Sequence, residues 1–281
     1  MPLSAASIHA RLLTAGLPTF PRTVARLEHL IVEVEAPAAI IASVIATDPS
    51  LATLVIGQTN AAGHSTTQLS EAIRRTGMGV VLSTARSAVP IPEAQRSALA
   101  TCWAQANATA VLLPMLVDYR QHIIHSTWDA ETLYLVGLIH DMGHVLAMGQ
   151  FQAEYARAAK RLADGEQDLE SLIASELGAT PSQLVALAAH TWHLPPVLAI
   201  PMAHWRKPGG APDLAELTAA VHIAHVLVHA AGFSAAGDRY VPIMDDWALT
   251  KLNLRIADCE TLLARMFDAM DELELYEGAL R

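Results

Sequence analysis

The stretch that decides the fold runs from Gly137 to His144 and reads Gly-Leu-Ile-His-Asp-Met-Gly-His. It follows the apolar run 133–136, so we expect His140 and Asp141 to lie on a buried helix. A neighbouring His and Asp offer one neutral nitrogen and one carboxylate oxygen, both ligands for divalent cations. In an apolar environment such a pair is costly unless it is bonded to something. The stretch therefore predicts either a metal site or a buried polar contact between helices.

His140 and His144 are four residues apart, which places one above the other on a continuous helix. This spacing resembles the HxxxH of zinc peptidases, but Asp141 stands where those enzymes carry a glutamate base. Gly143 also weakens the helix between the two histidines. A peptidase is therefore disfavoured.

The other histidines form two groups in a chain that has 13 of them. His222, His225 and His229 are spaced by three and four residues, so they share one helix face. Such a stripe could bind a metal or sense pH. We favour the alternative, in which they are core or interface histidines hydrogen-bonded to carbonyls. The second group borders two tryptophans and comprises His190, His193 and His204. Packing explains the position of these histidines better than metal ligation does.

Composition predicts an all-α protein. Of the 281 residues 52% are hydrophobic and only 16% charged, which excludes intrinsic disorder. The apolar residues are mostly Ala, Leu, Val and Ile, their spacing is helical, and no segment alternates with period two long enough for a sheet. Prolines near 90–93 mark a boundary between an N-terminal helical subdomain, residues 1–92, and a helical core with a C-terminal helix, residues 93–281.

Three further expectations concern the elements themselves. A helix capped near Thr127–Asp129 should run to about Met148, and Asp258–Tyr276 should form an amphipathic terminal helix. The Gly- and Asp-bearing stretch Phe233–Trp247 should be a loop.

Charge and hydropathy argue against several classes of protein. The net charge of −10, from 18 basic and 28 acidic residues, argues against binding to nucleic acid or to anionic membranes. Two long windows, Ser97–Val117 and Leu177–Trp205, contain no Asp, Glu, Lys or Arg. They contain amides, prolines or histidines, which are costly in a membrane, and are interpreted as buried segments. Cys102 and Cys259 form no disulfide framework, and the N-terminus lacks a signal-peptide pattern. A cytoplasmic location is therefore expected.

Several short motifs occur in a recognisable order. They are Leu17-Pro18-Thr19-Phe20-Pro21, Asp48-Pro49-Ser50-Leu51, Asn60-Ala61, Glu71-Ala72-Ile73 up to Gly77, Trp103, Gly137–Gly143, Trp192-His193-Leu194-Pro195 and His204-Trp205. Over roughly residues 15–235 this order resembles the HDOD family, the HD-related output domain of bacterial signalling proteins. The resemblance implies an N-terminal helical bundle packed on a five-helix core similar to that of HD-superfamily metal phosphohydrolases.

The resemblance also implies where a metal would be held. HD enzymes use a histidine, an adjacent His-Asp pair and a later aspartate. Here the first position corresponds to Gln105, the pair is His140 and Asp141, and the last position corresponds to His225. A further histidine of many family members falls near Pro181 and is missing. An amide is a poor ligand for Zn or Fe, and half a ligand set would hold a catalytic cation weakly.

The leading hypothesis is therefore a cytoplasmic signalling module without catalysis and without a cofactor. It would act through contacts with other signalling proteins, with a small ligand in the former HD pocket, and the apolar composition also favours a homodimer. In this hypothesis Asp141 pairs with a histidine such as His204 or His225 as a buried polar lock between helices. The pocket candidates are Gln105, His140, Asp141, His204 and His225.

The rival hypothesis is a metal-dependent phosphohydrolase acting on a nucleotide or cyclic di-nucleotide. Its rearranged ligand set would be His140, Asp141, His204 and His225. A third hypothesis, a nucleic-acid-binding regulator, is disfavoured by the charge of −10.

Overall fold

The structure is a computed structural model that describes residues 3–13, 16–91, 93–124, 128–165 and 167–272. The described residues form helices throughout, which confirms the all-α prediction. A single parallel pairing of two residues on each side, Pro18–Thr19 (β1) with Val89–Pro90 (β2), is the only strand pairing in these residues. It was not expected, since two-residue strands leave no periodicity in the sequence.

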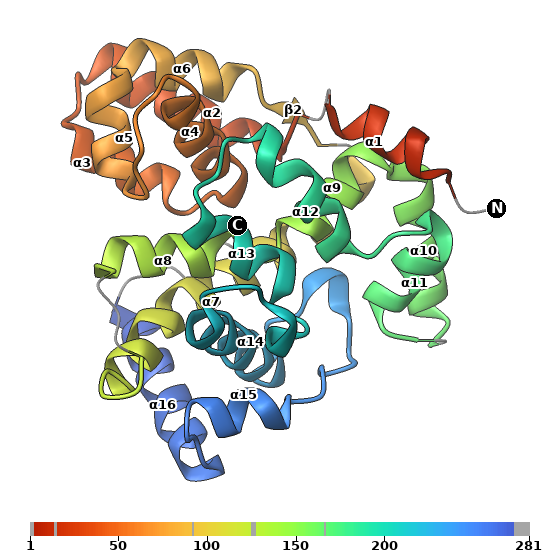
Figure 1. Ribbon diagram of the computed structural model, residues 1–281. Helices are drawn as coiled ribbons and strands as arrows, with labels where there is room; N and C mark the ends of the chain where they lie inside the picture. The colour runs from red at the N-terminus through yellow and green to blue at the C-terminus, as the bar shows by residue number, and fades with distance from the viewer. Residues whose placement is uncertain (1–2, 14–15, 92, 125–127, 166, 273–281) are drawn as a thin grey trace.

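The N-terminal helices α2 to α6 gather at one end of the molecule, while α1 lies apart from them and packs on α12 (Figure 1). The elements of this part are α1 (Ala5–Leu13), α2 (Pro21–Glu28), a π-helical turn η1 (His29–Glu33), α3 (Ala38–Ile45), α4 (Pro49–Ala61), α5 (Leu69–Thr76) and α6 (Met78–Arg86). The boundary at residues 92 and 93 stays a prediction.

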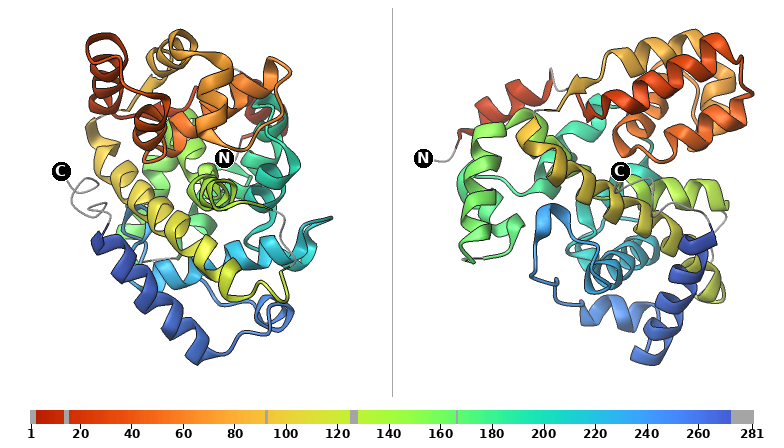
Figure 2. Two further views of the ribbon diagram at one scale, coloured as in Figure 1. Left: turned by 90° about the vertical axis from the view of Figure 1, so that its left-hand side faces the viewer. Right: turned by 180° about the vertical axis from the view of Figure 1, so that it is seen from behind.

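The remaining elements build the larger part of the molecule (Figures 1 and 2). They are η2 (Glu93–Gln95), α7 (Arg96–Tyr119), α8 (Ala130–Ile139), α9 (Met142–Gln150), α10 (Gln152–Ala163), α11 (Leu169–Leu177), α12 (Pro181–Thr191), α13 (Pro196–His204), η3 (Pro208–Gly210), α14 (Ala215–Ala230), η4 (Ala235–Gly237), α15 (Asp246–Lys251) and α16 (Ile256–Glu272). The expected terminal helix is α16, and residues 273–276 of that prediction lie outside the described residues.

Local sequence explains where several helices begin. Asp48 accepts a hydrogen bond from the backbone N–H of Leu51 at 3.1 Å, and Pro49 occupies the first position of α4. Thr180 and Gln183 form a reciprocal capping box at the start of α12. These caps satisfy N–H groups that a helix leaves without partners in its first turn.

The core is centred on α7, which packs against α8 and α14. Glu93–Tyr119 is the one helical stretch of the described residues that is long and apolar enough to cross a membrane, apart from the bent pair of α11 and α12. Of its apolar window, 72% is buried inside the protein. Its apolar side chains are therefore packed against other helices, as expected for the window 97–117.

Two expectations about elements need correction. The helix predicted from Thr127–Asp129 to about Met148 is two helices, because the backbone leaves helical geometry at Asp141, with φ −108° and ψ 28°. The stretch Phe233–Trp247 is not all loop, since it contains the short turn η4 and the start of α15. Asp245 caps α15 by accepting hydrogen bonds from the N–H groups of Trp247 and Ala248.

Candidate functional site

The break between α8 and α9 positions the His-Asp pair. His140 caps the C-terminus of α8, and Asp141 precedes the first residue of α9. Two glycines, one on each side of the pair in the sequence, let the backbone of other segments approach closely. A Cβ at Gly137 would lie 2.7 Å from the Cα of Ala110 in α7, and one at Gly143 would lie 2.3 Å from the carbonyl oxygen of Pro181. The motif therefore keeps small residues where α8 and α9 meet neighbouring backbone.

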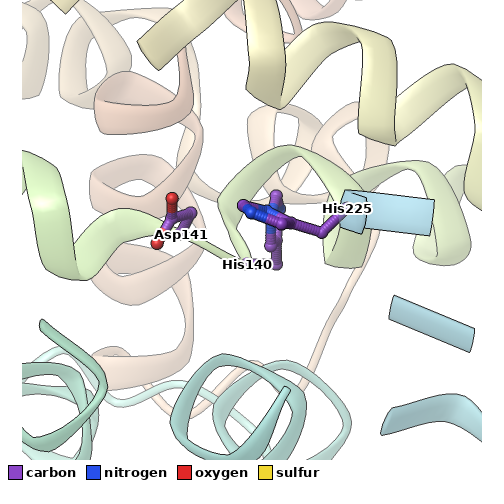
Figure 3. A group of neighbouring side chains, drawn as sticks. All are labelled: His140, Asp141 and His225. Carbon is purple, nitrogen blue, oxygen red and sulfur yellow. The ribbon is translucent and has the colours of Figure 1, made fainter. Parts of the chain in front are cut away.

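The buried pair His140 and His225 is the centre of the site (Figure 3). His140 Nδ1 lies 2.7 Å from the carbonyl oxygen of Gly137, so Nδ1 carries the proton and donates it. His140 Nε2 lies 2.8 Å from His225 Nδ1. Because a neutral His140 keeps a lone pair on Nε2, His225 must donate from Nδ1. The bond joins α8 to α14 across 85 residues of sequence.

Trp205 packs on both histidines. Its ring centroid lies 3.9 Å from that of His225, tilted by 35°, and 5.4 Å from that of His140 in an edge-on arrangement. The guanidinium of Arg206 lies over the indole ring of Trp205, 4.6 Å from the ring centroid. Arg206 is ion-paired with Glu170 of α11. The site is thus closed on one side by an aromatic ring and a paired cation.

Burial sets the charge of the site. It lowers the pKa of His140 to about 4, and it holds the pKa of His225 well below its usual range, with a further contribution from His140. Burial raises the pKa of Asp141 to about 7, against the opposing effect of the Arg206 guanidinium. At neutral pH both histidines are therefore uncharged and Asp141 is close to its titration midpoint.

The structure brings together three of the five predicted pocket residues. His140, Asp141 and His225 offer ligand atoms that all lie within 4.8 Å of one another (Figure 3). His204 is not in this group and lines a neighbouring cavity. Gln105 is buried on α7, and its side-chain NH₂ group has no hydrogen-bond partner among the described residues.

The polar lock between helices exists, but its partners differ from those expected. His225 bonds to His140 rather than to Asp141. The Asp141 carboxylate lies 3.9 Å from Nε2 of His144, which is too far for a hydrogen bond. His140 and His144 do not share one continuous helix, because the chain breaks between them.

The three residues fit a hydrolytic metal centre poorly. The lone pair of His140 that could bind a cation accepts the His225 proton instead. The nitrogen of His225 nearest the group is protonated in that bond, and metal ligands must be deprotonated. The one carboxylate present has a pKa of about 7, so about half of it is protonated at neutral pH.

The remaining histidines of the α14 stripe confirm the favoured interpretation. His222 Nδ1 donates to the carbonyl oxygen of Trp205 at 3.0 Å, and His229 Nε2 donates to that of Asp238 at 2.9 Å. His222 Nε2 also accepts from the N–H of Asp245 at 2.9 Å. Both histidines therefore connect α14 to other segments through carbonyl groups.

The sequence analysis missed the part played by Arg206. It lines a cavity of about 770 Å³ together with His204, Lys207 and residues of α11, α12 and the segment after α14. The available signal was an arginine directly after a tryptophan at a helix end, Trp205-Arg206. An arginine in that place can lie over the indole ring and remain charged at a cavity wall.

Comparison with solved structures supports the fold. The MmoQ response regulator from Methylococcus capsulatus matches with a TM-score of 0.66 at 20% identity, over 89% of this chain and 98% of that one. A virulence factor from Campylobacter jejuni matches with a TM-score of 0.61 at 18% identity, over 80% and 84%. An HDOD domain protein of unknown function from Geobacter sulfurreducens matches with a TM-score of 0.51 at 14% identity, over 97% and 96%.

No curated protein matches the chain. The family model of the HDOD domain matches residues 17–208, which is more than half of the sequence and includes the break at His140 and Asp141. The helical architecture and the order of the motifs agree with this match. The chain therefore belongs to the HDOD family.

Proposed function

We propose that this protein is a non-catalytic signalling module that acts through contacts with other proteins, with an HD-type site closed by a histidine pair. The observation that carries the proposal is the bond of 2.8 Å between His140 Nε2 and His225 Nδ1. It uses the lone pair through which His140 would bind a cation. A cation could bind His140 only after this buried bond had broken.

The family comparison supports the same conclusion. HD enzymes hold their metal with two further groups, which correspond here to Gln105 and His225. Replacing a carboxylate by a neutral histidine removes one negative charge from the site, and an amide oxygen binds Zn or Fe weakly. The solved structure with a TM-score of 0.66 is a response regulator, a protein of signal transduction. We extend the proposal to signalling proteins as partners and to the cytoplasm as the location.

One observation favours a second function. His140, Asp141 and His225 still bring three ligand-type side chains together, as a metal-dependent phosphohydrolase would need. If the histidine bond opened, a nucleotide or cyclic di-nucleotide could be the substrate. The two functions differ in whether the purified protein holds a metal.

The test measures metal content and hydrolysis. The wild-type protein, purified without chelator or affinity-tag metal, should hold far less than one Mn, Fe or Zn per chain. It should not hydrolyse a cyclic di-nucleotide above the rate of an Asp141→Ala variant. One equivalent of metal together with Asp141-dependent hydrolysis would overturn the proposal and establish the second function.

A gain-of-function variant makes a metal-free result informative. The double substitution Gln105→His and His225→Asp restores the two ligand types that HD enzymes carry, and it removes the histidine bond. This variant should bind close to one divalent cation per chain under conditions where wild type binds none. Exchange of the exposed His190 for Gln is the control, since it leaves the site untouched. If the double variant binds no more metal than the control, the ligand assignment is wrong.

A further inference from the structure

The cavity of about 770 Å³ lies beside the HD-type site but is distinct from it. None of His140, Asp141 and His225 lines the cavity, whereas Trp205, which packs on both histidines, does. The wall is built from the first turns of α11 and α12, the end of α13 with the residues after it, α14, and residues 238–243. Pockets of about 300–1,000 Å³ take small organic ligands. The cavity therefore has room for one such molecule.

Arg206 is a cation of this wall with hydrogen-bond donors to spare. Its Nε is paired with Glu170, and its guanidinium lies over the indole ring of Trp205. Among the described residues no hydrogen bond uses its two Nη groups, and 26% of the side chain is exposed. Two Nη groups held side by side in one plane are the fork that binds both oxygens of a carboxylate. The ion pair and the stacking fix the direction of this fork in advance.

Lys207 places a second cation next to the first. It is exposed, lines the same cavity, and has no ion-pair partner among the described residues. An ammonium on a flexible stem adds positive charge without demanding one fixed geometry. The two neighbouring residues thus give the cavity one oriented and one adaptable cation.

The acidic residues of the wall are already bonded to groups of the protein. Asp168 accepts hydrogen bonds from the N–H and the hydroxyl of Ser171, at 3.0 and 2.6 Å. Asp238 accepts from the backbone N–H groups of Leu169 and Tyr240, at 2.8 and 2.9 Å. The third carboxylate is the one paired with the arginine. The charged groups still open to a ligand are therefore donors, so the ligand must bring acceptors. The three carboxylates nevertheless repel a dianion more than a monoanion.

The remaining wall is apolar on the side of residues 240–243. All four line the cavity, and three of them are large side chains with much exposed surface. Ile243 is 92% exposed, Val241 48% and Tyr240 44%. Covering such surface by an apolar group is favourable, since water is released from both. The ligand thus gains from an apolar body as well as from its charge.

We infer that this cavity binds a small monocarboxylic acid with an apolar body. Its carboxylate accepts from both Nη groups of Arg206, Lys207 supplies the second positive charge, and the apolar body covers residues 240–243. The inference goes beyond the proposed function, because it gives the signalling module a ligand at a site outside the HD-type group.

Isothermal titration calorimetry at pH 7.5 tests the class of ligand. The probes are phenylacetate and octanoate, an aromatic and an aliphatic monocarboxylate. At least one of them should bind with a dissociation constant of about 1 mM or tighter. Phenylacetamide, which lacks the charge, and phenyl phosphate, which carries a second one, should each bind about 10-fold more weakly than phenylacetate. Absence of binding by both acids at about 10 mM, or binding of the amide as tight as that of phenylacetate, would overturn the inference.

Substitutions then test the location with whichever acid binds more tightly. Arg206→Lys keeps a cation for Glu170 but removes the planar fork, and it should weaken binding about 10-fold. Lys207→Ala, at an exposed position, should weaken it about 2- to 5-fold. Lys160→Ala is the matched control, since Lys160 is an exposed lysine of α10 that does not line the cavity. Circular dichroism checks that each variant is folded.

Unchanged affinity in both cavity variants would show that the acid binds elsewhere and would refute the inference. The metal content of the HD-type site enters none of these measurements. A failure here therefore leaves the proposed function standing, and a metal-loaded HD-type site would leave this inference standing.

Discussion

Replacing His225 by phenylalanine measures the contribution of the histidine pair to stability. The ring of the new residue can still pack on Trp205, so the aromatic contact at 3.9 Å between centroids is largely kept. The bond to His140 is lost, which leaves the Nε2 lone pair of a fully buried histidine without a donor. A buried group deprived of its partner costs about 1–3 kcal/mol. That is a substantial share of a total stability of about 5–15 kcal/mol.

Urea unfolding followed by circular dichroism gives the free energy of each variant at pH 7.5. His225→Phe and His140→Phe should each lose about 1–3 kcal/mol, and the double variant should lose less than their sum, because no unpaired nitrogen remains. His190→Phe, at an exposed position of α12, is the control and should change stability by less than about 0.5 kcal/mol. If His225→Phe is as stable as wild type and the two substitutions are additive, the pair is not a stabilising contact.

Three further predictions follow from single positions. Burial raises the pKa of Asp141 from its ordinary 3.8 to about 7, so the native state holds this proton more tightly than the unfolded state and the free energy of unfolding declines as pH rises from about 4 to 7. In urea titrations Asp141→Asn should remove that decline and should be more stable than wild type at pH 8. Gly143→Ala should cost about 1–3 kcal/mol in thermal unfolding, because a Cβ would lie 2.3 Å from the carbonyl oxygen of Pro181; an unchanged midpoint would show that α9 can shift freely. Asp48→Ala should cost about 1 kcal/mol or more by removing the cap on Leu51 N–H, measured by urea unfolding against the cap-preserving Asp48→Asn.

Local sequence was sufficient to predict most helices. The cap and proline of Asp48-Pro49 predict the start of α4 because both effects act within one helical turn. Gly77 predicts the end of α5 for a similar reason, since its φ of +80° is unfavourable for other residues. The break at Asp141 was not predictable, because the contact of Gly143 with Pro181 joins residues 38 positions apart.

The site was predicted in part. The motif placed His140 and Asp141 next to each other, and the resemblance pointed to His225 as the third residue. Sequence spacing could not show which of the three would bond together, since the bond between His140 and His225 depends on how α8 crosses α14. Sequence spacing also could not exclude His204 from the site. This residue directly precedes Trp205 in the sequence but lines the neighbouring cavity.

The histidine pair also leaves the charged form of Asp141 without a hydrogen-bond donor among the described residues. In an HD enzyme one cation compensates both the histidine and the aspartate of the adjacent pair. On the proposed function, His225 replaces the cation for His140 alone, because its N–H donates to the lone pair of His140. The neutral His225 ring brings no positive charge to the Asp141 carboxylate. Asp141 keeps only the field of Arg206, and that guanidinium is already paired with Glu170. Burial therefore outweighs attraction, and the pKa of Asp141 is raised because its carboxylate is buried near a cation that is already paired elsewhere.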